Sequence, residues 1–363
     1  MRRRLQSPSL LADIDIREAA ALAHRFQAEL AASKSAVSRR EFDWYPYDSF
    51  GTISVFDSVL TGANRWLRSL IGDEPVLDAG CGDGAVSFFL ESLGARVYAV
   101  DHAPTNYNRM AGVKALKSVL RSSVRVASMD LDARPDFREC GLALMLGVLY
   151  HLKNPFGVLE SLAAKAHYCL LTTAITRYST DGRTSLTGLP VAFLAGRNGL
   201  RGDETNYWIF TEAALLNLID RTGWEVADSN IVEDRESTLW GSQRDQRAFC
   251  LLRSRLRPPV ERPQLVAGWH ELENDAWRWT ERRFSISLPA PANVKLRCTV
   301  PDVVPVPIAL SCGGTTRTFP AIGDYDIEVP AGRGVLEFEL DHALAPGPHD
   351  GRERGIIVRA VDL

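Results

Sequence analysis

The sequence predicts an α/β domain followed by an all-β domain, and two observations carry this prediction. Between residues 75 and 174, short apolar runs alternate with helical segments, which is typical of a parallel sheet with crossover helices on both faces. Beyond a proline-rich stretch, short alternating runs are separated by Pro and Gly, as in a β-sandwich. A chain of 363 residues is long enough for both domains.

The composition is that of an ordinary globular protein, with 45% hydrophobic and 24% charged residues. A net charge of −3 gives no global field that would attract nucleic acid or an anionic membrane, so neither is an expected partner. The start of the chain has no uninterrupted apolar run, so we expect no signal peptide or membrane span and a cytoplasmic location. The six cysteines lack C-x-x-C spacing, which predicts reduced thiols and no metal site.

Residues 1–50 are expected to form a helical segment and an aromatic lid. A helix is predicted over residues 13–33 from the helical spacing of Leu22, Phe26 and Leu30. The aromatic stretch FDWYPYDSFG follows at 42–51, and VLTGANRWLRSL at 59–70 predicts a further helix.

The sheet of the α/β domain, residues 51–255, is expected to begin at residue 75. A helix over 211–222 is predicted from Thr211 as its N-cap and Gly223 at its end. The runs 224–232 and 247–253 have only a loop between them, so they predict an antiparallel hairpin that ends the sheet. The earlier strands are predicted at residues 75–79, 96–100, 124–129, 142–147 and 168–174.

Two segments interrupt this pattern. Residues 176–209 form a polar, Gly-rich insertion, and insertions of that length are usually lids or binding loops. Residues 256–268, LRPPVERPQLVAG, predict a linker. The β-sandwich is then expected over residues 269–363, from runs such as VKLRCTV and VLEFEL.

A glycine turn between the first two strands, in VLDAGCGDGAVSFFLESLGARVYAVD, predicts the cofactor. Gly80, Gly82 and Ala85 also satisfy the pattern of a dinucleotide site. However, Asp78 lies at the end of the strand that leads into this turn, and its carboxylate would repel the pyrophosphate of a dinucleotide bound there. S-adenosylmethionine instead carries a cationic ammonium and sulfonium at its methionine end. The sign of the charge therefore favours the methyl donor over NAD, while the glycines let the backbone approach the ligand.

Three further polar residues are candidate cofactor contacts. Asp101 closes the second strand, where a carboxylate accepts hydrogen bonds from ribose hydroxyls. Asp130 follows the third strand and could accept from an adenine amino group, although a loop or cap carboxylate is the alternative. Asn106 lies shortly after Asp101 and is expected to contact the cofactor or the lid.

The ordered series DAGCGDG, AVD, MDLD and LMLGVLYHL resembles the motifs of class I S-adenosylmethionine-dependent methyltransferases over about residues 70–255. The resemblance implies a Rossmann-like, seven-stranded, mostly parallel sheet with an antiparallel last strand. It implies S-adenosylmethionine as cofactor and S-adenosylhomocysteine as product. The cofactor contacts that it implies are Asp78, Gly80 and Gly82 at the methionine end, Asp101 at the ribose, Asp130 with Leu131 at the adenine, and Gly147 near the sulfonium. His102, directly after Asp101, is a further candidate cofactor residue.

The predicted acceptor site follows the fourth strand in GVLYHLKNP, at the sheet edge where ligands of such sheets bind. His151 is the predicted general base, since the pKa of histidine lies near neutrality; a hydrogen bond to the lid is the alternative role. Tyr150 is expected either as a pocket wall or in the core. Aromatic side chains with polar tips suit a pocket that is partly exposed to water. The aromatic residues before the domain could equally anchor the N-terminal segment on the sheet. The candidate substrate residues are Tyr45, Tyr47, Asn206, Tyr207 and Trp208.

Within the superfamily, GVLYHLKNPFGVLE most resembles the tRNA wobble-uridine carboxymethyltransferase group. That group has arginines after its LYH motif, where this sequence has Leu152 and Lys153. The difference and the weak net charge favour ordinary S-adenosylmethionine and a small acceptor. An RNA-modifying enzyme stays the alternative, and a continuous basic face would distinguish it.

The ends of the β domain, GWHELENDAWRWT and DGRERGIIVRAVDL, resemble β-sandwich modules of bacterial glycosyltransferases and other polysaccharide-assembly proteins. Trp277 and Trp279 are expected either to stack on a sugar or to lie in the core. Arg352 and Arg354 are expected to pair with Asp350 or Glu353. The resemblance favours a saccharide or sugar-linked acceptor.

Together these observations predict an O-methyltransferase acting on a saccharide or another small molecule. A non-catalytic glycan- or partner-binding protein on a methyltransferase scaffold is an alternative of a different class, because a fold does not imply a function. A homo-oligomer is compatible with the sequence, since the β domain could bury a sheet edge against a second copy.

Overall fold

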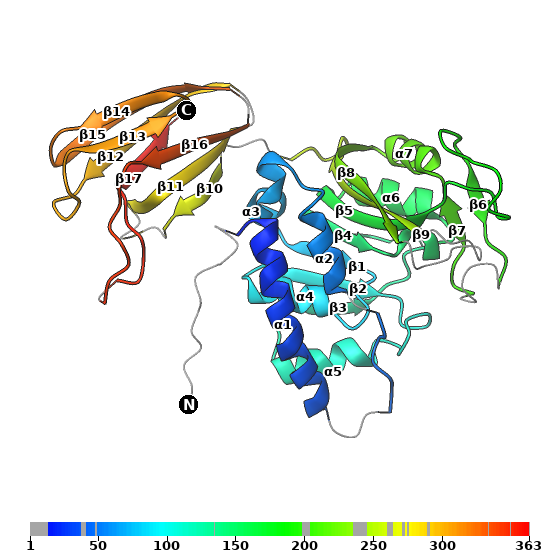
Figure 1. Cartoon of the computed structure of the whole chain (residues 1–363). Coiled ribbons are helices and arrows are strands. Elements are labelled where there is room, and N and C mark those ends of the chain that lie inside the picture. Colours follow the sequence, from blue (N-terminus) through cyan, green and yellow to red (C-terminus); the bar gives the residue numbers. More distant parts are fainter. Residues whose placement is uncertain are drawn as a thin grey trace. The chain divides into compact units, whose positions relative to one another are not determined.

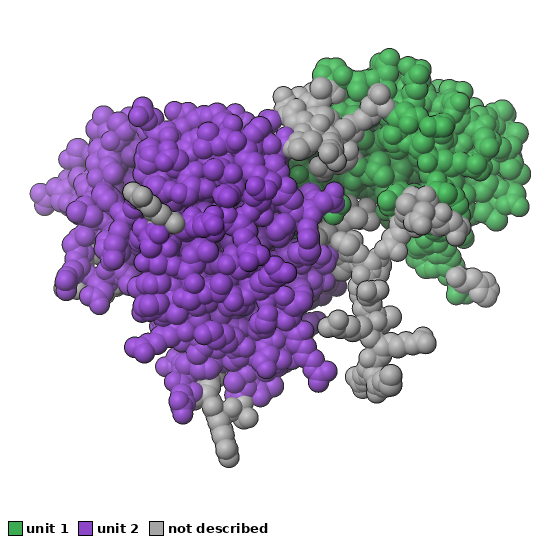
Figure 2. Space-filling model, turned by 180° about the vertical axis from the view of Figure 1, so that it is seen from behind, with its two compact units in different colours: residues 1–15, 62–69, 260–363 green, residues 16–61, 70–259 purple. Residues whose placement is uncertain are grey.

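The computed structural model describes residues 14–37, 41–47, 49–133, 135–197, 204–234, 245–259, 264–270, 273, 276–288, 291–332, 334–348 and 350–362. The chain divides into two compact units (Figure 2). The larger unit contains residues 16–61 and 70–259, and the smaller one contains residues 1–15, 62–69 and 260–363. Among the described helices, none is both long and apolar enough to cross a bilayer.

The larger unit is built on a mixed sheet of nine strands (Figure 1). Seven of them follow the order β3-β2-β1-β4-β5-β9-β8. The pairs from β3 to β5 are all parallel, whereas β9 is antiparallel to both of its neighbours, so the predicted mostly parallel arrangement with an antiparallel end is confirmed. The seven strands are β1 (Val76–Ala79), β2 (Val97–Asp101), β3 (Arg125–Ser128), β4 (Cys140–Leu146), β5 (Ala166–Ile175), β8 (Trp224–Asp234) and β9 (Asp245–Ser254).

The other two strands, β6 (Ala192–Leu194) and β7 (Trp208–Phe210), come from the predicted insertion 176–209. β7 pairs in parallel with the last residue of β5 at the pair Ile175–Phe210, and β6 pairs with β7 in antiparallel fashion. The prediction of seven strands was therefore two short. The run Trp208–Phe210 is aromatic and β-branched, and Ile209 is fully buried, which favours a strand over a loop. Residues 198–203 of the insertion lie outside the described residues.

Helices cover both faces of this sheet (Figure 1). Successive strand residues point to opposite faces, and in β9 the residues Ala248 and Cys250 belong to the core under α6 and α7. Phe249 points the other way and packs edge-on against Phe56 of α2, with 5.7 Å between ring centroids. The helices are α1 (Ile16–Ala36), α2 (Phe50–Phe56), α4 (Ala85–Ser92), α5 (Ala111–Leu120), α6 (Pro155–Ala163) and α7 (Glu212–Arg221).

The predicted N-terminal helix is α1, whose buried positions include Ile16, Ala19, Ala23 and Leu30 at helical spacing. The prediction of one helix over residues 59–70 was wrong. The segment forms a short 3-10 helix, η2 (Gly62–Arg65), and then α3 (Leu67–Ile71). Gly62 has φ +51°, a left-handed conformation that interrupts the right-handed helical ladder.

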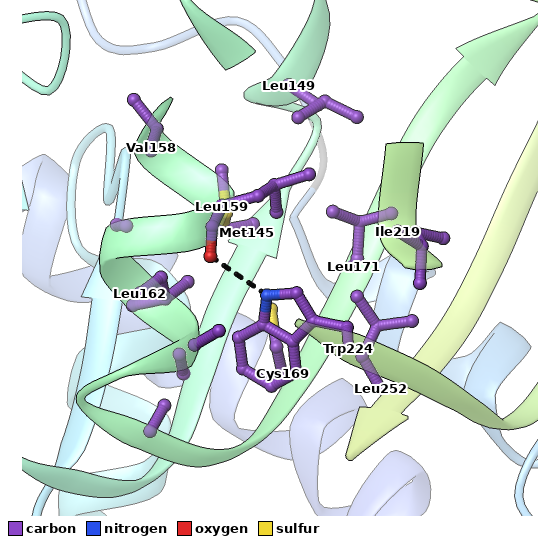
Figure 3. Packing of buried hydrophobic residues seen from close by; sticks show 14 of the residues in the cluster. Met145, Leu149, Val158, Leu159, Leu162, Cys169, Leu171, Ile219, Trp224 and Leu252 are labelled. Carbon is purple, nitrogen blue, oxygen red and sulfur yellow. Dashed lines mark hydrogen bonds between the residues drawn. The ribbon is translucent and has the colours of Figure 1, made fainter. Parts of the chain in front are cut away.

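Trp224, the first residue of β8, lies at the centre of the core on the α6 and α7 face (Figure 3). Its indole Nε1 donates a hydrogen bond of 2.9 Å to the carbonyl oxygen of Leu159 in α6. Leu149, after β4, is fully buried in the same cluster. The core therefore fixes the start of the short turn that carries Tyr150 and His151.

The smaller unit contains an antiparallel eight-stranded arrangement in the order β14-β13-β16-β11-β17-β12-β15, with β10 beside β11. Residues 278–279 of β11 pair with β17 and residues 283–288 pair with β16, so this strand is shared by two sheets that enclose one core. The predicted all-β sandwich is thus confirmed. The strands are β10 (Gln264–Trp269), β11 (Arg278–Leu288), β12 (Ala292–Val300), β13 (Ile308–Cys312), β14 (Thr315–Phe319), β15 (Gly323–Ala331), β16 (Gly334–Leu340) and β17 (Ile357–Asp362).

The predicted linker over 256–268 overlaps β10, which begins at Gln264. Val266 and Trp269 bury apolar side chains there, and this burial favours a strand despite the preceding prolines. Residues 260–263 of the linker lie outside the described residues.

The tryptophans near the start of this unit lie in or against its core rather than forming a sugar platform, and the arginines near its end form the expected ion pairs. Trp279 is a core residue and Trp277 packs against the same core. Arg352 pairs with Asp350 at 2.8 Å, and Arg354 lies 3.4 Å from the same carboxylate.

Candidate functional site

The glycine turn after β1 lies where the strand order reverses between β1 and β4, the usual ligand position of such sheets. Gly80, Gly82 and Gly84 have φ of +81°, +56° and +81°. A Cβ atom on Gly80 would come within 2.3 Å of Val148 Cγ2, in the loop after β4. Glycine is therefore required at this position both for the backbone conformation and for the close approach of the two loops.

Asp78 lies inside the base of the turn, where only 4% of the side chain is exposed. Its carboxylate accepts a hydrogen bond of 2.6 Å from Ser87 Oγ in α4. Burial raises the pKa of Asp78 to about 6; the Ser87 hydrogen bond opposes this shift, and the charge of Asp101 adds to it. Asp78 thus faces the helix that follows the turn, and its predicted contact with the methionine end stays a prediction.

Asp101, at the end of β2, connects that strand to the glycine turn. Its Oδ2 accepts hydrogen bonds from Gly82 N at 2.9 Å and from Asn106 Nδ2 at 3.0 Å, and its Oδ1 accepts one from His102 N at 2.8 Å. An ionised carboxylate offers about four acceptor positions, so this one retains capacity for a ligand hydroxyl. The structure thus brings the candidate cofactor residues His102 and Asn106 together with Asp101.

Asp83 is a site residue that the sequence analysis missed. Its Oδ2 accepts a hydrogen bond of 2.7 Å from Tyr45 N, and its Oδ1 accepts one of 2.7 Å from Asn108 Nδ2. The carboxylate is buried, with Lys34 Nζ of α1 at 3.7 Å. Asp83 therefore holds the aromatic segment 41–47 against the glycine turn. The only signal in the sequence was an acidic residue between two glycines.

The ring of Tyr45, from the aromatic segment 41–47, lies over the glycine turn. Its ring lies 3.5 Å from the position that a Cβ on Gly82 would take, and its centroid is 5.2 Å from that of Tyr47. Burial raises the pKa of the Tyr45 phenol, and nearby Tyr150 and Asp101 raise it further. Tyr45 therefore lies near Tyr150, after β4, as well as near Asp101 at the end of β2.

A cavity of about 180 Å³ lies beside the turn, on the side of α1. It is lined by residues of α1, the aromatic segment, the start of α2, the turn and the first residue of α4. Its polar and charged lining comes from Gln27, Lys34, Tyr45, Tyr47, Ser49 and Asp83.

Tyr150 and His151 lie on η3 (Leu149–His151), the turn after β4. Tyr150 Oη accepts a hydrogen bond of 3.2 Å from Arg247 Nη2 of β9. His151 Nδ1 lies 3.1 Å from the carbonyl oxygen of Thr205 and 3.0 Å from its Oγ1. A carbonyl oxygen only accepts, so this geometry favours a proton on Nδ1 and leaves Nε2 as the basic nitrogen of the neutral ring.

The insertion supplies a second wall beside this turn. Tyr207 N donates to Tyr150 O at 2.8 Å, and Lys153 Nζ lies 5.8 Å from the centroid of the Tyr207 ring. Trp208 Nε1 donates to Lys153 O at 3.4 Å. Asn206, between them in sequence and only 7% exposed, belongs to the same segment. The predicted acceptor residues of the insertion are therefore gathered beside Tyr150.

The loop after β3 borders the site on the side predicted for adenine. Asp130 is exposed and its Oδ1 accepts a hydrogen bond of 2.9 Å from Asp132 N, as in a loop carboxylate, while Leu131 belongs to the core. Asp132 was not singled out in the sequence. It accepts hydrogen bonds from Lys153 N at 3.0 Å and Asn154 N at 2.8 Å, and so connects this loop to the one after β4.

Gly147 ends β4 in a left-handed conformation with φ +79°. A Cβ there would lie 3.3 Å from Tyr150 Oη and 3.8 Å from Arg247 Nη1. Gly147 therefore lies next to the Tyr150–Arg247 pair. Arg247 was not identified from the sequence, because a lone arginine in an apolar strand carries no motif.

Within the described residues, no three His, Cys, Asp or Glu side chains come together as they would around a metal ion. All six cysteines are buried and none is in a disulfide.

A family model described as a methyltransferase domain matches residues 16–229. The chain is 26% identical over 193 residues to a ubiquinone biosynthesis O-methyltransferase of Methylobacterium sp. (strain 4-46), and the match covers 49% of this chain and 73% of that protein.

Similar solved structures include the N-terminal domain of EvdMO1, crystallised in the presence of S-adenosylhomocysteine and D-fucose. Its TM-score is 0.41 at 15% identity, covering 63% of this chain and 97% of that one. Magnesium protoporphyrin IX methyltransferase from Synechocystis PCC 6803, with bound S-adenosylhomocysteine, has a TM-score of 0.36 at 18% identity, covering 66% and 86%.

Proposed function

This chain belongs to the family of methyltransferase domains, and from that premise we propose that it uses S-adenosylmethionine to O-methylate a saccharide or another small molecule. The observation that carries the proposal is the meeting of the glycine turn, Asp101 and the Tyr150–His151 turn where the strand order reverses. Oxygen as the acceptor atom is supported by the sequence relative, which is named as an O-methyltransferase. A saccharide acceptor rests on the resemblance of the β domain to modules of polysaccharide-assembly proteins.

The residues present fit the methyl donor. Glycine conformations with positive φ keep side chains off the ligand side of the turn, and Asp101 retains acceptor capacity at the end of β2. Gly80 and Gly82 would hold the methionine end, and Asp101 with Asn106 would hold the ribose. When bound, this cofactor supplies a methyl group that a sulfonium already activates.

The remaining task of the protein is to align the acceptor oxygen and to remove its proton. His151 Nε2 takes the proton of the acceptor hydroxyl, because Nδ1 is engaged with Thr205. Tyr150, held by Arg247, orients the acceptor at the end of β4. Tyr207 and Trp208 of the insertion exclude water from the acceptor side, since both rings contact Lys153, just after the same turn.

Radiolabelled S-adenosylmethionine, incubated with the protein and a metabolite extract that is then fractionated by size and charge, tests this proposal. Label in saccharide or small-molecule fractions is the expected result. Label in RNA would instead favour an RNA-modifying enzyme. Titration calorimetry with S-adenosylhomocysteine tests the non-catalytic alternative, because a mere scaffold should not bind it.

A further inference from the structure

The cavity beside the glycine turn combines an acidic and a basic side chain from different parts of the chain. Asp83 comes from the turn itself and Lys34 from the last turn of α1, and both line the cavity of about 180 Å³. One water needs only about 15 Å³ of such volume, so the cavity has room for several heavy atoms of a ligand.

The two charges lie close together but are not tightly paired. Lys34 Nζ is 3.7 Å from Asp83 Oδ2, beyond the length of about 2.8 Å that is usual for a charge-assisted hydrogen bond. The other described contact of Lys34 Nζ is the face of Trp44, with 5.2 Å to the ring centroid. An ammonium group has three donors, so Lys34 retains capacity for an anionic ligand group.

A ligand with one charge would satisfy only one of these side chains. A zwitterion satisfies both, because its anion can lie beside Lys34 and its cation beside Asp83. An α-amino acid carries its ammonium and carboxylate groups on the same carbon atom, which matches the 3.7 Å separation of the Lys34 and Asp83 charged groups.

We propose that Lys34 and Asp83 together recognise the zwitterionic amino-acid end of the methyl donor, with its carboxylate beside Lys34 and its ammonium beside Asp83. This inference rests on the proposed function. It assigns the role of the acidic partner to Asp83 rather than to Asp78, because Asp83 lines the cavity, whereas the carboxylate of Asp78 is directed to Ser87 in α4. Tyr45, whose backbone N–H donates to Asp83, lines the same cavity.

Calorimetric titration of the full-length protein with two probes tests the proposal. S-adenosylhomocysteine carries the amino-acid end, whereas 5′-methylthioadenosine keeps the nucleoside but lacks that end. Lys34→Met is expected to weaken S-adenosylhomocysteine at least tenfold, as for loss of a hydrogen bond to a charged group, and to change 5′-methylthioadenosine less than about twofold. Lys34→Arg should recover most of the loss, because it restores the positive charge.

Arg17→Met is the matched control, since Arg17 is a cation on the same helix that pairs with Asp57 at 3.2 Å. It should leave the binding of both probes unchanged. Equal effects of Lys34→Met on both probes, or no effect on either, would overturn the inference while leaving the proposed function intact. If the unaltered protein binds neither probe, the proposed function itself fails.

A measurement on the unaltered protein keeps the proposal testable even if the variants do not fold. S-adenosylhomocysteine that lacks its carboxylate should bind at least tenfold more weakly than the complete compound. Equal affinities would contradict a role of Lys34 in holding that carboxylate.

Discussion

His151 Nδ1 lies 3.1 Å from the carbonyl oxygen of Thr205, so the insertion fixes the orientation of the imidazole ring. If His151 is the general base, His151→Ala should lower kcat about 100-fold or more. The dissociation constant of S-adenosylhomocysteine should change little, because the ring is not among the proposed cofactor contacts. Steady-state kinetics and calorimetry measure the two quantities. His342→Gln, in the smaller unit, is the control, and an unchanged kcat in His151→Ala would remove His151 from the mechanism.

Asp101→Asn tests the ribose contact. The amide would present an N–H group to the donors around Asp101, and binding of S-adenosylhomocysteine and 5′-methylthioadenosine should weaken alike, by about tenfold or more, because both contain ribose. Asp136→Asn, at a side chain that is 97% exposed, should have no effect. Unchanged affinities in Asp101→Asn would argue against the proposed cofactor position.

Gly80→Ala should destabilise the larger unit by about 3 kcal/mol, the sum of a left-handed backbone cost and a steric clash. The added Cβ would lie 2.3 Å from Val148 Cγ2. Gly188→Ala is a matched control, since Gly188 has φ +80° with no atom within 4 Å of its Cβ position, and it should cost about 1 kcal/mol. Urea unfolding measures both free energies.

The clash part of that cost should be recovered by a second substitution. Adding Val148→Ala to Gly80→Ala removes the methyl group that the new Cβ meets, so the double variant should be more stable than the two single losses combined. Additive losses would show that Gly80 and Val148 do not approach each other closely.

Asp78 makes the free energy of unfolding depend on pH. Its pKa is raised in the folded protein to about 6, so the native state binds the proton more tightly than the unfolded chain. The stabilisation from this proton is complete below about pH 4 and is lost as the pH rises through 6, by about 3 kcal/mol in total. Relative to Asp78→Asn, the unaltered protein should therefore lose stability between pH 4 and 7. Urea unfolding at several pH values checks this, and parallel pH profiles would contradict it.

Seven of the nine strands of the larger unit and the caps of α7 were predictable because their signals are local. Thr211, for example, does cap α7 by accepting from Ala214 N, and Gly223 follows that helix with φ +87°. The glycine turn was predictable for the same reason, since few residues tolerate its backbone conformation. Strand β10 was not, because the prolines before it suggest a linker and only the packing of Val266 and Trp269 outweighs them.

The site was less predictable than the fold because its contacts join distant segments. Asp83 meets Tyr45, which lies 38 residues earlier, and Arg247 meets Tyr150 across 97 residues. Neither pairing has a periodicity or a spacing that a sequence could reveal. The position of Asp78 at the end of its strand predicted an electrostatic role toward the cofactor, whereas the direction of its side chain depends on Ser87 in the next helix.

The most direct test of a sulfonium cofactor is a competitive calorimetric titration of the full-length protein with S-adenosylmethionine and NADH. We predict saturable binding of S-adenosylmethionine at one site, displaced by S-adenosylhomocysteine and unaffected by NADH. Saturation by NADH without any binding of S-adenosylmethionine would contradict the claim that this protein uses a sulfonium cofactor, and with it the proposed function.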